Sequence, residues 1–341
     1  MQMKRALGRA VCWAILAAGM GWRVGVARGD ALPASSIPAE AGWVMHLDVD
    51  AVRASPLWEI FNKKFVEPRK EEFAGRQRWI EAATGTNMQK ELHDLTLFGT
   101  TFNETSVCLL IHAPMDQARV TSLLKGDPEF KTTVHNGHTI MSWRDNDKVL
   151  YGSFAAGEMA VLGRSSKMVA MVLDTMDGKS PALNNERLLP VAATTMAGEG
   201  QVSSPMLWMA AINLSDLSRA QKVDSPFMLQ IDTASVAIGA TRERLSARMA
   251  VLAKSEKAAQ QLMAAADGVK AMIALAAADE RARPQVRTLG SALQSLTLTM
   301  DGKDVTANWS VELEKLDSML EVVRLQPKPA TGQATTTRRG E

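Results

Sequence analysis

The chain has few of the residues that form disulfides or stack on nucleic-acid bases. Its 341 residues include 2 cysteines, 1 tyrosine and 5% aromatic residues. Cys12 lies in an N-terminal segment that we expect to be removed, so Cys108 is left alone and an internal disulfide is excluded. The scarcity of aromatic side chains argues against a base-stacking surface. Because Cys108 lies within an apolar run, we expect a buried thiol rather than a nucleophile.

A strong net charge is also lacking. The full chain carries 39 basic and 37 acidic residues, a formal charge of +2. Residues 1–31 hold five of the basic residues and one acidic residue, which leaves 34 basic and 36 acidic residues and a charge of −2. Since both signs are interspersed, we expect no nucleic-acid partner.

Motifs of familiar catalytic sites are missing as well. The sequence has no Gly-x-Ser-x-Gly turn, no phosphate-binding Gly loop followed by Lys and Ser or Thr, and no His-Glu-x-x-His. We therefore predict no catalytic residue and no cofactor from motifs, and we favour a role other than catalysis.

The first 31 residues have the pattern of a secretory signal peptide. Basic residues precede an apolar stretch from Ala10 to Trp22, and small residues follow it. This stretch of 13 residues is shorter than the roughly 20 that cross a bilayer. We expect cleavage after Ala31 or Ala27, export to the periplasm or the outside of the cell, and no later apolar run of spanning length.

Alternating apolar residues and turn signals predict an α+β protein with many antiparallel strands. Asn136-Gly137 predicts a two-residue hairpin turn, because it supplies two positive-φ positions. Asp145-Asn-Asp147 predicts another turn, and Asp301-Gly302 a third hairpin. The expected strands are 41–49, 94–101, 105–112, 130–135, 138–143, 148–155, 158–163, 206–214, 228–240, 244–253, 295–300 and 305–313. The expected helices are 55–83, 115–124, 165–176, 256–282 and 316–323.

The helix expected over 256–282 is rich in alanine. Its apolar residues recur at steps of three and four, so we expect one stripe to face a core: Leu262, Ala266, Val269, Ile273 and Ala276. A membrane-surface helix is the alternative, but the polar face lacks an excess of Lys and Arg.

The order of elements suggests an internal duplication. Residues 95–125 align without a gap on 235–265, which places Gly99 on Gly239, and the strand at Trp43 resembles the strand at Trp208. We expect each half to be an antiparallel sheet with helices on one face and a ferredoxin-like strand and helix order. The expected divisions are a signal peptide (1–31), a first repeat (32–177), a linker (178–205), a second repeat (206–325) and a disordered tail (326–341).

His46, Asp48 and Asp50 form the best candidate site in the sequence. On an alternating strand they share one face, and a histidine with two carboxylates can bind Zn²⁺ or Mn²⁺ or supply a base. The alternative is structural, because aspartates at the end of a strand cap helices and turns. His135 and His138 flank the Asn-Gly turn and are a weaker metal candidate.

Three segments carry a resemblance to a known group of proteins. SIPAEAGWVMHLDVDAVRASPLWEI, HNGHTIMSW and AVLGRSS, which fall mainly within residues 36–177, resemble uncharacterised secreted bacterial proteins of the planctomycete type. The resemblance implies export and carries no functional residue.

Three functions remain open at this point. The first is an exported, non-catalytic scaffold or binding protein whose partner is a protein or an envelope component. The second is a metal-dependent hydrolase that uses His46, Asp48 and Asp50. The third is a carrier for a lipid or another apolar ligand, which the 20 methionines suggest because methionine suits adaptable pockets.

Overall fold

The computed structural model of the protein describes residues 34–156, 158–183, 188, 205–215, 226–279 and 281–316. The expected signal peptide, the expected tail and most of the expected linker lie outside these residues. The expected helix over 316–323 also lies outside them, apart from its first residue.

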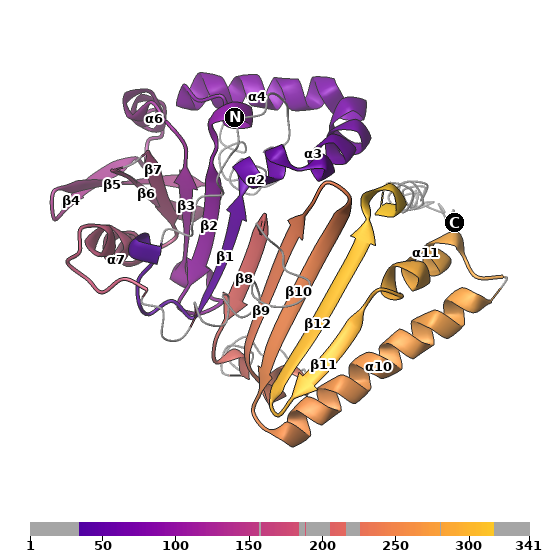
Figure 1. Ribbon diagram of the computed structural model, residues 1–341. Helices are drawn as coiled ribbons and strands as arrows, with labels where there is room; N and C mark the ends of the chain where they lie inside the picture. The colour runs from indigo at the N-terminus through magenta and orange to yellow at the C-terminus, as the bar shows by residue number, and fades with distance from the viewer. Residues whose placement is uncertain are drawn as a thin grey trace, which may run out of the picture.

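All twelve strands of the described residues form one antiparallel sheet (Figure 1). Their spatial order is β11-β12-β10-β9-β8-β1-β2-β3-β7-β6-β5-β4, so the two halves of the chain meet where β1 pairs with β8. The strands are β1 (Trp43–Asp48), β2 (Asp94–Gly99), β3 (Val107–His112), β4 (Lys131–His135), β5 (His138–Asp145), β6 (Lys148–Ala155), β7 (Met159–Gly163), β8 (Leu207–Ala211), β9 (Ile231–Ala240), β10 (Arg244–Ala253), β11 (Thr297–Asp301) and β12 (Asp304–Glu312). The α+β class and the antiparallel pairing that the sequence predicts are therefore both present.

Helices connect the strands in both halves. Between β1 and β2 the chain forms a series of short helices and one longer helix, which crosses the upper end of the sheet in Figure 1. The α-helices are α2 (Val49–Ala54), α3 (Pro56–Phe61), α4 (Lys70–Thr84), α5 (Met88–Glu91), α6 (Gln117–Leu124), α7 (Ser166–Met176), α10 (Glu256–Ala278) and α11 (Pro284–Leu293).

The predicted hairpin turns are confirmed. Asn136 and Gly137 have φ of 49° and 95°, so both central residues adopt the positive φ that a type I′ turn requires. Asn146 joins β5 to β6 with φ of 56°, and Gly302 joins β11 to β12 with φ of 57°. These turns fix the register of the strands on either side.

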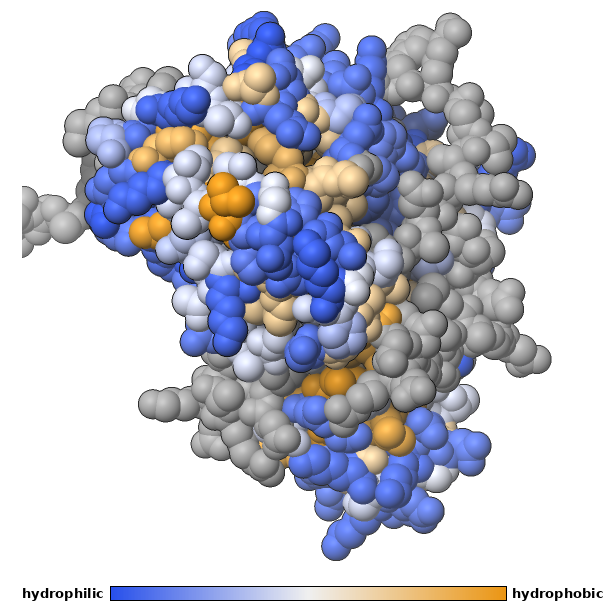
Figure 2. Space-filling model, turned by 90° about the vertical axis from the view of Figure 1, so that its left-hand side faces the viewer, coloured by the Kyte–Doolittle hydropathy of each residue, from blue (hydrophilic) through white to orange (hydrophobic). Residues whose placement is uncertain are grey.

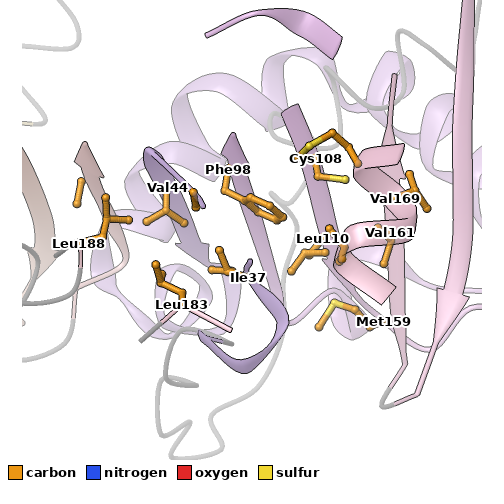
Figure 3. Close-up of a cluster of buried hydrophobic side chains, with 14 of the residues drawn as sticks. Ile37, Val44, Phe98, Cys108, Leu110, Met159, Val161, Val169, Leu183 and Leu188 are labelled. Atoms are coloured by element: carbon orange, nitrogen blue, oxygen red, sulfur yellow. The ribbon is translucent and has the colours of Figure 1, made fainter. Parts of the chain in front are cut away.

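Helices cover both faces of the first half, which corrects the expectation of one covered face. Cys108 and Leu110 of β3 belong to a core that also contains Val169 of α7 (Figure 3). Leu109 and Ile111 alternate with them and point to the opposite face, where a second core lies. On that second face, α6 packs its Leu124 against Met141 and Trp143 of β5. Because β3 is buried on both faces, its run of apolar residues does not alternate with polar ones.

The pairing of the first strands is not ferredoxin-like. A split βαβ unit would place another strand between β1 and β2. Instead β1 and β2 are direct antiparallel neighbours, with Trp43 opposite Gly99 and Asp48 opposite Asp94. β2 then pairs with β3 in the same way, so the first half begins as a meander.

The residue correspondence expected between the two halves is also wrong. Trp43 packs beside the core of the second half, whereas Trp208 belongs to the core that contains Val44 and Phe98, on the other face of the sheet. In the β1–β8 pair, Trp208 lies opposite His46 and Val44 lies opposite Ala210. Trp43 and Trp208 therefore occupy opposite faces, because a shift of one residue moves a side chain from one face to the other.

The long helix of the second half differs from its prediction in length and in surroundings. α10 ends at Ala278, and a separate helix, α11, begins at Pro284. Proline is favoured in the first turn of a helix, so Pro284 is the signal for this start. Only Ala258 and Ala259 of α10 are buried, and of the predicted apolar stripe Leu262 packs against the core of the second half.

Part of the expected linker packs in the core. Leu183 and Leu188 are both buried and join the core of Figure 3, where Ile37 is a neighbour. The Leu183 amide donates a hydrogen bond to the Ile37 carbonyl at 2.6 Å. These residues fasten the start of the linker to the segment that precedes β1.

Candidate functional site

His46, Asp48 and Asp50 do not form a common site in the structure. His46 is buried, and its Nδ1 lies 2.8 Å from Oγ1 of Thr96 on β2. Asp48 caps α2, where its Oδ1 accepts a hydrogen bond from the Ala51 amide at 2.7 Å. Among the residues that the structure describes, no three His, Cys, Asp or Glu side chains converge on a place where a metal ion could bind. The structural interpretation of Asp48 as a helix cap is confirmed.

Asp50 belongs to a different cluster, which the sequence analysis missed. One oxygen of Asp50, Oδ2, lies 2.8 Å from Nδ1 of His93, and the other lies 2.6 Å from the guanidinium of Arg53. Asp94 makes the matching contact with His112, between Oδ2 and Nδ1, also at 2.8 Å. The two imidazole rings lie side by side, with centroids 5.1 Å apart and ring planes inclined by 51°.

Strand pairing brings these residues together. Asp94 is the first residue of β2 and lies opposite His112, the last residue of β3. The His93 amide donates to the His112 carbonyl at 2.9 Å, and the Val49 amide at the start of α2 donates to the His93 carbonyl at 2.9 Å. Since α2 begins where β1 ends, Asp50 is held beside the ends of β2 and β3.

The cluster joins buried and accessible groups. The Asp94 side chain is 3% exposed, and its Oδ1 has no hydrogen-bond partner within the described part of the chain. The imidazoles are more accessible, with 36% of the His93 side chain and 26% of the His112 side chain exposed. The buried carboxylate of Asp94 therefore contacts an imidazole, that of His112, which is accessible to solvent.

Sequence reasoning missed this cluster because its members are distant in the chain. His93 and Asp94 are adjacent, but His112 and Asp50 join them only through the register of β2 with β3 and the start of α2. The available signal was the pair of predicted strands at 94–101 and 105–112. An antiparallel register for that pair places residue 112 opposite residue 94.

His135 and His138 do not share one partner. Nε2 of His135 lies 2.9 Å from Asp174, and Nε2 of His138 lies 3.0 Å from Asp177, so the hairpin is tied to the end of α7. Hydrogen bonds from Asn136 and from His135 lower the pKa of Asp174 below its ordinary value. The pKa of Asp177 is lowered by its contacts with Lys179 and His138. Both histidines serve here to join a hairpin to a helix.

Cys108 is an inert core thiol, as its sequence predicts. It is 1% exposed, and burial raises its pKa to about 12. A thiol of this kind holds its proton at neutral pH and is a poor nucleophile.

The second half contains an apolar pocket between α10 and α11. It has a volume of about 410 Å³, and one cation, Lys270, lies among apolar side chains. Lys270 donates a hydrogen bond from Nζ to the Leu296 carbonyl. The lining residues are Phe227, Leu262, Ala265, Ala266, Val269, Lys270, Leu293 and Leu296. Three members of the stripe predicted to face the core, Leu262, Ala266 and Val269, line this pocket, and Leu262 also packs against the core of the second half.

α10 also carries exposed apolar side chains. Val269 and Met272 are exposed, and Leu275 is 77% exposed. By length and composition alone the 23 residues of α10 are enough to cross a bilayer, which corrects the expectation of no later apolar run of spanning length. The side of the molecule shown in Figure 2 is mostly hydrophilic, with small apolar areas between charged and polar residues. In Figure 1 α10 lies at the far end of the sheet from β4.

Similarity to known proteins is found among solved structures. The chain matches no protein-family model, and no curated protein matches it. Among solved structures it is similar to the treponemal protein TP0453 in crystal form IV, with 12% identity, a TM-score of 0.45, and coverage of 87% of this chain and 99% of that one. Crystal form III of TP0453 gives 11% identity, a TM-score of 0.44, and coverage of 86% and 99%. Crystal form I gives 11% identity, a TM-score of 0.41, and coverage of 86% and 98%.

Proposed function

We propose that the protein is an exported, non-catalytic binding protein of the cell envelope that holds an apolar partner against α10 and α11. The observation that carries this proposal is α10 itself. Not one residue of its most apolar 18-residue window is buried, and the window contains few charges. Large apolar side chains left in water are costly, at about 25 cal/mol for each Å² of apolar surface. A partner that covers this surface recovers that free energy.

The N-terminal sequence supports the envelope location. A basic start, a short apolar stretch and small residues before Leu32 direct a chain to the export machinery. The proposed partner is therefore a protein or another component of the envelope. Recovery of the mature protein from that compartment, beginning near Leu32 or Arg28, tests this part of the proposal. An intact Met1 on the exported protein would contradict it.

Contact between α10 and its partner can be tested by photo-crosslinking in cells. A photoreactive amino acid at Leu275 should capture an envelope component. Val134 on β4 is the matched control, because it is also apolar and also 77% exposed but lies at the other end of the sheet. Crosslinks from position 275 and none from position 134 support the proposal. Equal capture at both positions, or none at position 275, refutes it.

A carrier for a small apolar ligand is the second candidate, and the pocket between α10 and α11 favours it. Pockets for drug-sized molecules typically measure about 300–1,000 Å³, and this pocket, at about 410 Å³, falls in that range. Organic extraction of the purified protein followed by mass spectrometry tests this function. An extracted ligand should be lost in Ala266→Phe, which fills the pocket, and retained in Gly75→Ala, whose added methyl group on α4 meets nothing within 4 Å.

We also propose that the two halves arose by duplication, with a corrected correspondence. Both halves place their first strands in the same order, β1-β2-β3-β7 and β8-β9-β10-β12. The β1–β8 pair relates Val44 to Trp208, and each of these residues faces a buried residue on the next strand, Phe98 or Ala237. Superposition of the halves with Val44 on Trp208 should align more strands than superposition with Trp43 on Trp208. A better fit of the two tryptophans would contradict this correspondence.

A further inference from the structure

We propose that His93 and His112 together bind one divalent transition-metal ion, Zn²⁺ or Cu²⁺, through their Nε2 atoms. The site lies where β2 begins and β3 ends, in the first half of the chain. It is independent of the apolar surface of α10, so either proposal can fail without the other.

Within the described residues, the hydrogen bonds of the two rings leave the same nitrogen, Nε2, available on each. Nδ1 of His93 contacts Asp50 and Nδ1 of His112 contacts Asp94, both at 2.8 Å. A carboxylate only accepts, so each Nδ1 carries the proton and a neutral ring presents the lone pair of Nε2. Histidines that bind metals are commonly oriented in this way, with the second ring nitrogen bonded to a carboxylate.

The separation of the rings fits a shared ion. The centroids of His93 and His112 are 5.1 Å apart. When two imidazoles bind one tetrahedral metal ion through nitrogens at about 2.0–2.1 Å, their ring centres fall roughly 5 Å apart. The rings are also partly exposed, so an ion can reach them from solvent.

The charges around the rings favour a cation. Asp50 and Asp94 supply two carboxylates, and Arg53 supplies one guanidinium, which lies 2.6 Å from Oδ1 of Asp50. With both rings neutral, the cluster carries one net negative charge. Oδ1 of the buried Asp94 has no hydrogen-bond partner in the described residues, so a positive charge held beyond His112 would stabilise this carboxylate.

Pairing with aspartate does not by itself identify the site, because His135 and His138 have aspartate partners as well. The pair at β2 and β3 differs in two respects. Its rings lie in contact, and one of its carboxylates is almost fully buried. No third His, Cys, Asp or Glu of the described chain joins the two histidines as a metal-binding group, so water completes the coordination shell. Imidazole nitrogens suit Zn²⁺ and Cu²⁺, and Cu²⁺ should bind more tightly of the two.

Calorimetric titration of the tag-free, chelator-treated full chain with ZnCl₂ or CuCl₂ tests the site. We expect one equivalent to bind, with at least about a tenfold loss of affinity in His93→Gln and in His112→Gln. Asp94→Asn, which acts through His112, should weaken binding by about 10–100-fold while both histidines remain. The matched control is the double variant His135→Gln with His138→Gln, which removes two other aspartate-paired histidines and should bind as the wild type does.

NMR of the wild-type protein gives a second measurement that does not require a variant to fold. Of the five histidines, two should show ring proton signals that shift with Zn²⁺ or broaden with Cu²⁺. The EPR spectrum of the Cu²⁺ complex should show coupling to two nitrogens. Absence of Zn²⁺ and Cu²⁺ binding by the wild type, unchanged affinity in both single variants, or shifts confined to His135 and His138 would each overturn the proposal.

Discussion

Two glycine substitutions in the α10–α11 hairpin should have different effects on stability. Gly290 lies on α11, where an added Cβ would stand 2.3 Å from Cβ of Ala277 on α10. Gly268 lies on α10 itself, where an added Cβ meets nothing within 4 Å. The chemical change to alanine is the same at both positions, so only the surroundings differ.

The expected changes in the free energy of unfolding combine a gain in helix propensity with a cost of overpacking. Replacing glycine by alanine inside a helix favours folding by about 0.5–1 kcal/mol. Carbon atoms in contact prefer separations of about 3.5–4.0 Å, so the added methyl group of Gly290→Ala forces the helices apart by about 1 Å or more. Overpacking of this kind costs about 1–3 kcal/mol. Gly268→Ala should therefore stabilise the protein, and Gly290→Ala should be less stable than Gly268→Ala by about 1–3 kcal/mol.

Urea unfolding followed by circular dichroism measures both variants, and equal slopes allow the midpoints to be compared. If α10 and α11 open before the sheet unfolds, the rates of amide hydrogen exchange in these two helices measure the same difference in stability. Equal stabilisation by both substitutions would refute the packing of Gly290 on Ala277. That result would also contradict the pocket between α10 and α11, because the pocket depends on the same packing of the two helices.

Three further predictions concern the first half of the chain. Gly137→Val should destabilise the protein by about 1 kcal/mol or more, because a β-branched residue opposes positive φ; an unchanged melting temperature would count against the turn. Phe98→Ala should cost about 3–5 kcal/mol in urea unfolding, because the side chain is fully buried in the core, and a loss below 1 kcal/mol would show that this core is loosely packed. The lowered pKa of Asp174 should make stability fall as the pH drops below about 4, since the folded state then takes up a proton against its contacts with Asn136 and His135. Asp174→Asn should remove that part of the acid dependence in unfolding measured across pH, and an unaltered pH profile would show that the ion pair contributes nothing.

The fold could be predicted from the sequence wherever a local pattern decides the structure. Strand periodicity and the Asn-Gly and Asp-Gly turns predicted the hairpins. The predicted ends of β4 and β5 at their Asn-Gly turn agree with the structure to within a residue or two, because positive φ and alternation are properties of neighbouring residues. The faces of the sheet could not be predicted in the same way. Trp43 and Trp208 were matched by residue type, and a slip of one position in such a match reverses the face.

The candidate sites were harder to predict, because they depend on contacts between residues that are far apart in the sequence. Asp48 was correctly considered as a helix cap, because capping is decided by the three residues that follow it. The contact of His93 with His112 requires the register of β2 on β3. α11 was missed because Pro284 and Gly290 weaken a helical pattern by propensity, although proline suits a first turn and Gly290 permits close packing on α10.

The junction of β1 with β8 makes the two halves parts of one folded unit. One core contains Val44 and Phe98 from the first half, both labelled in Figure 3, and Trp208 and Ala237 from the second half. Each half alone would expose these side chains together with an unpaired strand edge, which is a site for aggregation. The second half, with α10 and its apolar surface, is therefore anchored to the first half by a shared core and not only by the chain between them. A partner that binds α10 would meet a helix supported at its start, where Ala258 and Ala259 are buried, and would find Met272 and Leu275 exposed further along it.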